Sequence, residues 1–125
     1  MMAQSAPILV NGIAPCPDTP NCVSTEATRA SQRVASVPFT DTPGQAMARA
    51  KAALLAEPRT RMTAESGNAI HAECKSRIFR FVDDVDIVVD SAAGVFRFRS
   101  ASRVGRSDLG VNAKRIARLA ARLAR

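Results

Sequence analysis

The stretch VDIVVDSAAGVFRFRS, residues 85–100, decides the fold that this sequence predicts. Apolar and polar residues alternate on both sides of the short segment SAAG. The apolar positions are Val85, Ile87, Val89, Phe96 and Phe98. Because successive side chains of a strand point to opposite faces, this pattern predicts two half-buried strands joined by a tight turn. The hairpin therefore has one apolar face, which another layer of the protein must cover.

The residues before this hairpin predict two more strands. TRMTAE, residues 60–65, is a short candidate strand, and SGN after it is a candidate turn. AIHAECKSR, residues 69–77, alternates strictly between apolar and polar positions. Its apolar positions are Ile70, Ala72 and Cys74, and its polar positions are His71, Glu73, Lys75 and Arg77. We therefore expect an antiparallel sheet of about four strands.

A helix is expected before these strands, over residues 43–57. Thr42 and Gln45 form a candidate capping box, Pro43 occupies the first helical position, and Pro58 ends the helix. One face of this helix is apolar and comprises Met47, Ala50, Ala53 and Leu54. That face is suited to pack against the sheet.

A second helix is expected after the strands, over residues 109–124. Its apolar stripe comprises Leu109, Ala113, Ile116, Leu119, Ala120 and Leu123, and its basic side comprises Lys114, Arg115, Arg118, Arg122 and Arg125. An amphipathic helix buries its apolar stripe, and the strands supply an apolar face for it. The predicted fold is therefore an α+β two-layer sandwich, with the N-terminal and the C-terminal helix packed on one face of the antiparallel sheet.

The chain is divided by composition into two parts. Its 125 residues are enough for one domain, and a hydrophobic content of 46% is enough for a core. Residues 1–41 hold five of the seven prolines and show no sustained period. We expect them to form an extended segment that lies on the domain or stays partly mobile. Residues 42–125 are expected to form the single α+β domain.

The charge of the chain is strongly basic, with a net value of +7, and most of the excess lies in the last 25 residues. A basic tail can bind nucleic acid, an anionic membrane or an acidic partner, but a solvated helix face is the favoured interpretation. The chain has no Trp and no Tyr, which argues against a reader of single-stranded nucleic acid that stacks bases on aromatic rings.

The N-terminal sequence MMAQSAPILVNGIAPC does not resemble an export signal. It lacks a basic leading region, and Pro7, Asn11 and Gly12 interrupt its apolar run. Pro15 stands before Cys16, where a lipoprotein cysteine needs a small residue. No stretch approaches the ~20 apolar residues of a membrane span. The sequence as given therefore predicts a soluble, cytoplasmic protein.

The polar stretch SASRVGRSDLGVN, residues 100–112, is the first candidate site. Ser107 or Asp108 can cap the second helix, but capping does not explain the other polar residues around them. The candidate binding residues are Ser100, Ser102, Arg103, Ser107, Asp108 and Asn112. A helix N-terminus beside an arginine and hydroxyls favours anions, whereas Asp108 would repel them. A purely structural corner is therefore the competing interpretation.

Charged residues on the strands give two further hypotheses. We expect Asp83 or Asp84 to pair with Arg103 and so to fix the geometry of the corner. His71 and Glu73 share one strand face and could act as a base and its orienting group, although no nucleophile accompanies them. The competing interpretation is a solvated face with cross-strand ion pairs to Arg97 or Arg99.

The three cysteines predict no metal site and no cofactor. Cys16 and Cys22 can close a small disulfide loop in an oxidising compartment, and in the cytosol they would be free thiols or a redox pair. The only histidine, His71, lies far along the chain, so a zinc ligand set is not expected. Cys74 is expected to be a small core residue.

Three segments of the chain resemble the DUF1499 family of small bacterial and plant proteins. They are CPDTPNCVST, HAECKSRIFRFVDDVDIVVD and RFRSASRVGRSDLGVNAKRI, and the matching motifs span residues 20–24, 76–84 and 99–112. Arg80 and Arg106 depart from the smaller or aromatic residues of the family pattern. The resemblance implies a shape and a set of candidate residues but no reaction. Because many relatives carry an export signal or anchor, it also implies a periplasmic or membrane-associated location.

Three functions follow as hypotheses. The first is a non-catalytic module that binds a ligand or a protein partner, with a rigid polar corner at residues 99–112. The second is a small enzyme that uses His71 and Glu73 within one concave pocket. The third is an electrostatic binder of nucleic acid or anionic lipid through Arg115, Arg118 and Arg122, whose affinity would fall steeply with salt. The chain is expected to be a monomer or a weak dimer.

Overall fold

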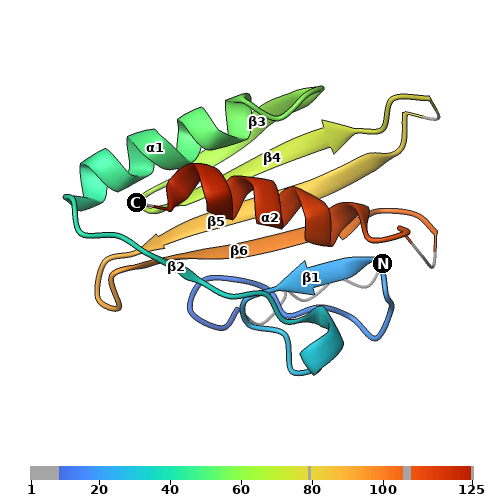
Figure 1. Cartoon of the computed structure of the whole chain (residues 1–125), viewed down its shortest axis with the longest axis horizontal. Coiled ribbons are helices and arrows are strands. Elements are labelled where there is room, and N and C mark those ends of the chain that lie inside the picture. Colours follow the sequence, from blue (N-terminus) through green and yellow to red (C-terminus); the bar gives the residue numbers. More distant parts are fainter. Residues whose placement is uncertain (1–8, 79, 106–107, 125) are drawn as a thin grey trace, which may run out of the picture.

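The computed structural model describes residues 9–78, 80–105 and 108–124. Figure 1 shows two helices and an antiparallel sheet. In chain order the elements are β1 (Cys22–Ser24), the 3-10 turn η1 (Ala30–Gln32), β2 (Val37–Pro38), α1 (Pro43–Leu55), β3 (Thr60–Ser66), β4 (Ala69–Lys75), β5 (Val82–Asp90), β6 (Val95–Ser102) and α2 (Val111–Leu123). The fold is α+β.

The sheet has six strands, not about four, because the N-terminal segment contributes two short ones. The order is β1-β6-β5-β4-β3, and β2 also pairs with β6. Cys22 of β1 lies opposite Ala101, and Val37 of β2 lies opposite Phe96. These strands have three and two residues, which is too short for an alternating pattern to appear in the sequence.

The four longer strands lie at the predicted stretches, although β5 begins at Val82, three residues earlier than expected. β5 and β6 form the predicted hairpin, with Val89 opposite Phe96. β4 pairs along its whole length with β5. β3 lies at one edge of the sheet, and its pairing with β4 shifts register between Met62 and Ala64. This shift is a β-bulge, which locally interrupts the ladder.

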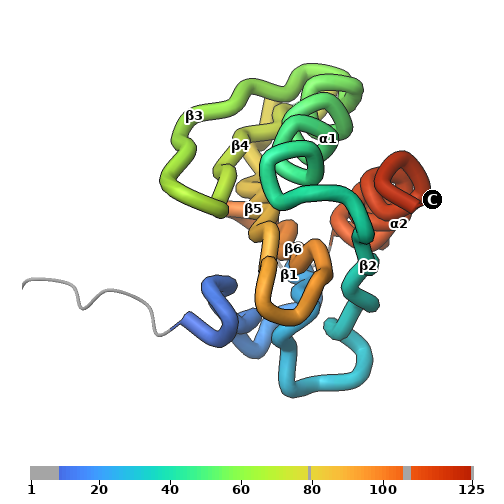
Figure 2. The backbone as a smooth tube through the Cα atoms, turned by 90° about the vertical axis from the view of Figure 1, so that its left-hand side faces the viewer, coloured from blue at the N-terminus to red at the C-terminus, as the bar shows by residue number. Residues whose placement is uncertain are grey.

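One core cluster joins the two helices to the sheet. Its largest fully buried side chains include Phe96 and Phe98 of β6, Leu54 of α1 and Leu119 of α2. Figures 1 and 2 show both helices on the same side of the sheet. The inward positions of the strands therefore face the helices, and their outward positions face the other way.

The N-terminal segment lies against the outward face of the sheet. Figure 2 shows its blue portion on the side away from the helices. Ile13 is buried, and Gly12 lies beside the side chain of Val88 on β5. The neighbouring residues Leu9, Ala14 and Pro15 line a cavity together with His71 and Asp86 of this face. The outward face is thus partly covered.

Helix α1 begins as predicted and ends two residues earlier. The hydroxyl of Thr42 accepts a hydrogen bond from the Gln45 amide, and the Gln45 side chain accepts one from the Thr42 amide, which completes the capping box. The helix ends at Leu55, and Glu57 beyond it is buried.

Helix α2 differs from its prediction at its first turn and on its faces. It begins at Val111 and not at residue 109, because Leu109 and Gly110 both have a left-handed backbone. Leu109 and Ala113, which were expected in the buried stripe, are exposed. Arg115, which was expected on the exposed basic side, is buried. Within the described ranges, no helix has the length and hydropathy that a membrane span requires.

Candidate functional site

Asn112 occupies the centre of the polar corner and is fully buried. Its side-chain oxygen accepts hydrogen bonds from the Ser100 hydroxyl at 2.6 Å and from Arg115 at 2.8 Å. Its amide nitrogen donates to the Ser102 hydroxyl at 2.9 Å and to the Asp108 carboxylate at 2.7 Å. A buried polar group is stable only when it is hydrogen-bonded, and these contacts provide that. The amide thereby ties α2 to β6.

Arg115 extends this network to β5. Its guanidinium lies 2.9 Å from the Asp83 carboxylate and 3.1 Å from the Ser100 hydroxyl. Both members of the ion pair are buried. Asp83 therefore pairs with Arg115 of α2, whereas Arg103 was a possible partner in the prediction from the sequence. Sequence reasoning missed Arg115 because arginine on an amphipathic helix is usually solvated.

Asp108 holds the start of α2. Its carboxylate accepts hydrogen bonds from the backbone amides of Gly110 at 2.8 Å and Asn112 at 3.0 Å. Burial would raise the pKa of Asp108, but its hydrogen bonds with Asn112 and Gly110 lower it below the ordinary value. The N-cap residue is Gly110 and not Asp108, but the Asp108 carboxylate satisfies the Gly110 amide and one first-turn amide. Ser107, the alternative cap and a candidate binding residue, lies outside the described residues.

Arg103 lies on the outward side of the sheet. It forms two hydrogen bonds to Asp84, at 2.8 and 2.9 Å, and one to Glu73 at 2.9 Å. Burial raises the pKa of Asp84, but Arg103 and then His71 outweigh this and lower it. The structure therefore joins Arg103 to Asp84 and not to Asp83, and this pair stands apart from the buried network around Asn112.

His71 bridges two carboxylates on β5. Its Nδ1 lies 2.7 Å from Asp86, and its Nε2 lies 3.0 Å from Asp84. Burial lowers the pKa of His71, but Asp86 and Asp84 together raise it above the ordinary value. Both ring nitrogens are engaged by carboxylates, which favours the protonated ring and is unfavourable for a general base.

His71 and Glu73 do not share a cavity among those formed by the described residues. His71 lines the cavity under the N-terminal segment, whereas Glu73 lines a basic pocket between β3 and β4. Arg97, which was expected as a cross-strand partner of this strand face, pairs instead with Glu26 and Asp90. The enzyme hypothesis required both side chains in one pocket, and this arrangement does not provide it.

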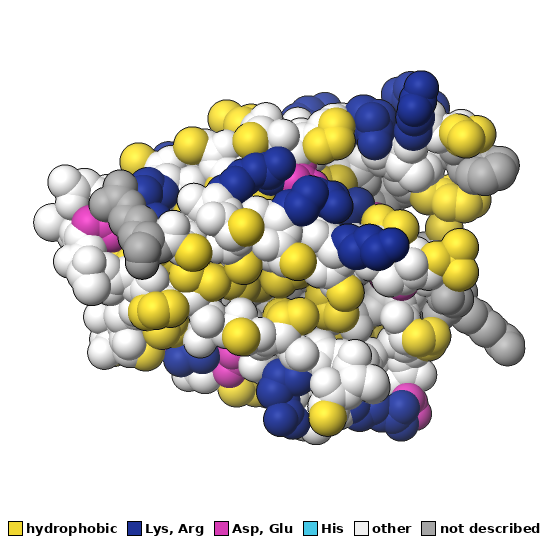
Figure 3. All heavy atoms as spheres, in the orientation of Figure 1, with side chains coloured by type: hydrophobic (Ala, Val, Ile, Leu, Met, Phe, Trp, Pro, Cys, Tyr) yellow, Lys and Arg dark blue, Asp and Glu magenta, His cyan; other side chains and the backbone are white. Residues whose placement is uncertain are grey.

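The basic residues of α2 are largely paired within the chain. Arg118 and Arg122 both bind the buried carboxylate of Glu57, and Arg118 does so at 2.8 Å. Burial would raise the pKa of Glu57, but the two arginines lower it. Figure 3 shows Lys and Arg side chains on the surface over α2. Much of the helix's positive charge is thus compensated locally.

The cysteines divide as a pair and a single thiol. Cys16 and Cys22 form a disulfide, which attaches the N-terminal segment to β1. Cys74 is free and buried, and its sulfur lies 3.0 Å from the Thr60 hydroxyl. Burial raises the pKa of the Cys74 thiol. Among the residues with described positions, no group of three His, Cys, Asp or Glu side chains is placed to hold a metal ion.

An apolar groove of about 580 Å³ opens beside the polar corner. Its apolar lining consists of Phe81, Val104, Leu109 and Val111, and its polar lining includes Asp83, Ser102 and Asp108. The four apolar side chains are all exposed. Sequence reasoning missed this groove, because it assigned Leu109 to the buried stripe of α2. Gly110 beside it was the available signal, since a glycine at that place commonly marks a turn.

The comparisons with known proteins bear on the whole chain. A search of curated proteins finds no match. Residues 12–123 match the family described as "Protein of unknown function (DUF1499)". This match covers nearly the entire chain, including the disulfide, both helices and the polar corner. The chain therefore belongs to the DUF1499 family, as the resemblance of its three segments predicted.

Proposed function

We propose that the protein is a non-catalytic binding module that holds a small, largely apolar ligand in the groove between Phe81 and Leu109. The observation that carries this proposal is the placement of Leu109. Its side chain is 86% exposed, although its backbone is left-handed, with φ at 53°. A left-handed conformation costs a non-glycine residue roughly 1–2 kcal/mol, and a side chain that is 86% exposed gains little burial in return. A ligand that covers Leu109 would provide that burial.

The shape and chemistry of the groove support a small ligand. Its volume of about 580 Å³ lies within the range of typical ligand pockets. Exposed apolar side chains gathered around a hollow are uncommon on a protein without a binding role. The floor residues Asp83, Ser102 and Asp108 are fixed by hydrogen bonds to α2 and its first turn. A preformed site of this kind needs little ordering when it binds.

The two other hypotheses have weaker support. An enzyme built on His71 would need a free ring nitrogen, and both nitrogens are hydrogen-bonded. An electrostatic binder built on α2 would need exposed and uncompensated arginines. Arg115 is buried against Asp83, and Arg118 and Arg122 share Glu57. The groove at the polar corner is therefore the function that we favour.

A neutral fluorescent probe, N-phenyl-1-naphthylamine, tests the groove. We expect saturable binding to the wild type and roughly tenfold or greater weakening in Leu109→Asn, since a buried leucine contributes about 1.5–3 kcal/mol. Asparagine tolerates the left-handed backbone, so this variant should remain folded. Leu55→Asn is the matched control, because Leu55 is also exposed but lies outside the groove.

Two results would contradict the proposal. One is unchanged probe affinity in Leu109→Asn, and the other is an equal loss in Leu55→Asn. Native mass spectrometry of protein purified gently from its own host provides a separate measurement. A retained small molecule that Leu109→Asn releases would support the groove. An empty chain that also fails to bind the probe would exclude the proposal and favour a protein partner.

A further inference from the structure

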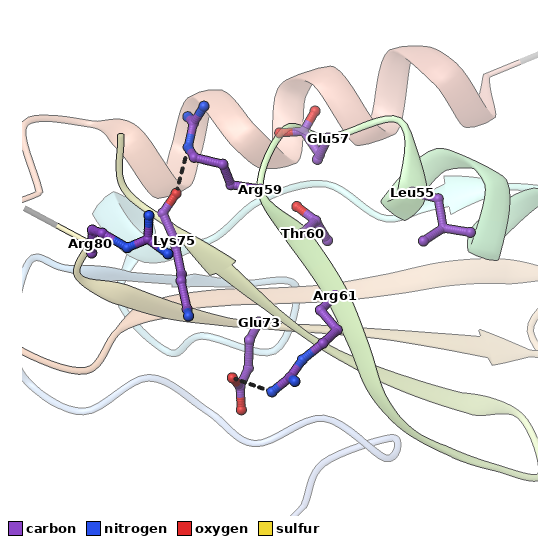
Figure 4. Close-up of a pocket in the computed structure, with 8 residues that line it drawn as sticks. All are labelled: Leu55, Glu57, Arg59, Thr60, Arg61, Glu73, Lys75 and Arg80. Atoms are coloured by element: carbon purple, nitrogen blue, oxygen red, sulfur yellow. Dashed lines mark hydrogen bonds and ion pairs between the residues drawn. The ribbon is translucent and has the colours of Figure 1, made fainter. Parts of the chain in front are cut away.

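We propose that a second site, the basic pocket between the start of β3 and the end of β4, binds a phosphate group. The pocket has a volume of about 470 Å³. Four cationic side chains line it, namely Arg59, Arg61, Lys75 and Arg80. Figure 4 shows Arg59, Lys75 and Arg80 at one end of the pocket and Arg61 beside Glu73 at the other. This site is distinct from the apolar groove and does not depend on it.

The two carboxylates of the pocket are already compensated by other arginines. Glu57 is bound by two arginines of α2, which lie outside the lining. Glu73 accepts a hydrogen bond from Arg103 at 2.9 Å and lies 3.7 Å from Arg61. These carboxylates therefore do not balance the remaining cations of the pocket.

Three cations of the pocket are left without a carboxylate partner in the described part of the chain. Arg59 donates from Nε to the backbone carbonyl of Lys75 at 2.9 Å, which is not a charged partner. Lys75 and Arg80 form no ion pair with any described carboxylate. Like charges held around one hollow repel each other, and an anion between them would relieve this repulsion.

The backbone holds two of these cations in unusual conformations. Arg59 has φ at 53° and Arg80 has φ at 57°, both in the left-handed region. This region is uncommon for bulky residues, and such residues cluster where a ligand is clamped. The bond from Arg59 to the Lys75 carbonyl fixes the Arg59 side chain across the strand ends. Both residues line the same pocket.

A phosphate monoester fits this charge better than a carboxylate does. It carries about two negative charges at neutral pH and three acceptor oxygens. Guanidinium groups match phosphate oxygens in pairs, and a lysine adds a point charge. Both a free phosphate compound and a lipid headgroup present this chemistry, so the two sources are distinguished by experiment.

Calorimetric titration of the full chain with inorganic phosphate at low ionic strength tests the site. We expect saturable binding that weakens as salt is added. The variant Lys75→Gln/Arg80→Gln should bind at least about tenfold more weakly, because it removes two positively charged hydrogen-bond donors from the pocket. Sedimentation with phosphatidylcholine vesicles that contain phosphatidic acid is the second arm. Binding in that arm alone would identify a lipid headgroup as the source.

The control variant is Arg77→Gln/Lys114→Gln, which removes the same charge from exposed positions outside the pocket. It should retain wild-type binding, and circular dichroism should show both variants folded. Equal weakening in both variants would show that phosphate binding depends on the overall positive charge of the protein and not on this pocket. That result would overturn the proposal. Absence of binding in both arms would overturn it as well. Neither result alters the expected probe binding at Leu109, so the two proposals fail independently.

Discussion

At the scale of the residue, Asn112 and Arg115 are buried polar side chains that belong to one network of hydrogen bonds and an ion pair. Asn112 uses both amide atoms to join Ser100 and Ser102 of β6 with Asp108. Arg115 belongs to the same network and forms an ion pair with Asp83. Such a network is costly when one partner is lost, because the remaining groups stay buried and unsatisfied.

Replacement of Arg115 by Met should therefore destabilise the protein strongly. The variant leaves the Asp83 carboxylate buried without its cation, and breaking a buried ion pair in this way costs about 3–5 kcal/mol. Urea unfolding followed by circular dichroism measures the loss. Lys114→Met, one position earlier and exposed, is the control and should change stability little. A similar small change in both variants would show that the Asp83–Arg115 pair is not needed for stability.

At the scale of the element, the capping box and the strand alternation made α1 and the four longer strands predictable. These signals are local, so each element carries its own pattern. The missed strands β1 and β2 depend instead on β6, which supplies their partners. The first turn of α2 was missed because the left-handed pair at Leu109 and Gly110 displaces the helix start.

His71 links two elements, β4 and β5, in a way that depends on pH. Because its folded-state pKa is raised, protonated His71 contributes stability below its unfolded pKa of about 6.5. This contribution is lost as the pH rises through the folded-state pKa. The stability difference between wild type and His71→Asn should therefore shrink toward high pH.

NMR titration checks this directly, since His71 is the only histidine and gives one imidazole signal. We expect a midpoint above that of an unperturbed histidine. The variant Asp86→Asn should move the midpoint down, because Asp86 is the stronger of the two raising partners. A midpoint at or below the ordinary value in the wild type would contradict the bridge seen between β4 and β5.

At the scale of the whole molecule, the N-terminal segment is attached at several places. Ile13 is buried and lines a cavity with His71 and Asp86 of the outward face, Cys16 is bonded to Cys22, and β2 pairs with β6. The candidate sites were harder to predict than this fold. The sequence shows the polar residues at 100–112. It does not show which of them are buried and which line a groove, because this depends on contacts with residues that are distant in the sequence. The basic pocket likewise assembles residues from three separate segments.

Loss of the disulfide should lower the stability of the molecule by a moderate amount. The bond joins residues six positions apart, and closing so short a loop is worth roughly 2 kcal/mol in the chain-entropy model. Thermal unfolding of Cys16→Ser/Cys22→Ser measures this loss. A thiol assay on the native, unreduced wild type should detect little reactive sulfur, because Cys74 is buried and its pKa is raised. Two rapidly reacting thiols from Cys16 and Cys22 would contradict the disulfide.

The bulge in β3 affects whether two copies of the protein can associate through the edges of their sheets. A free sheet edge is a template on which a further strand can add, and long flat edges promote aggregation. Here the register shift between Met62 and Ala64 interrupts that template, and the charged side chains of Arg61 and Glu65 flank it. The opposite edge consists of the short strands β1 and β2, which have three and two residues. The sheet is thus protected at both ends against growth into a fibril.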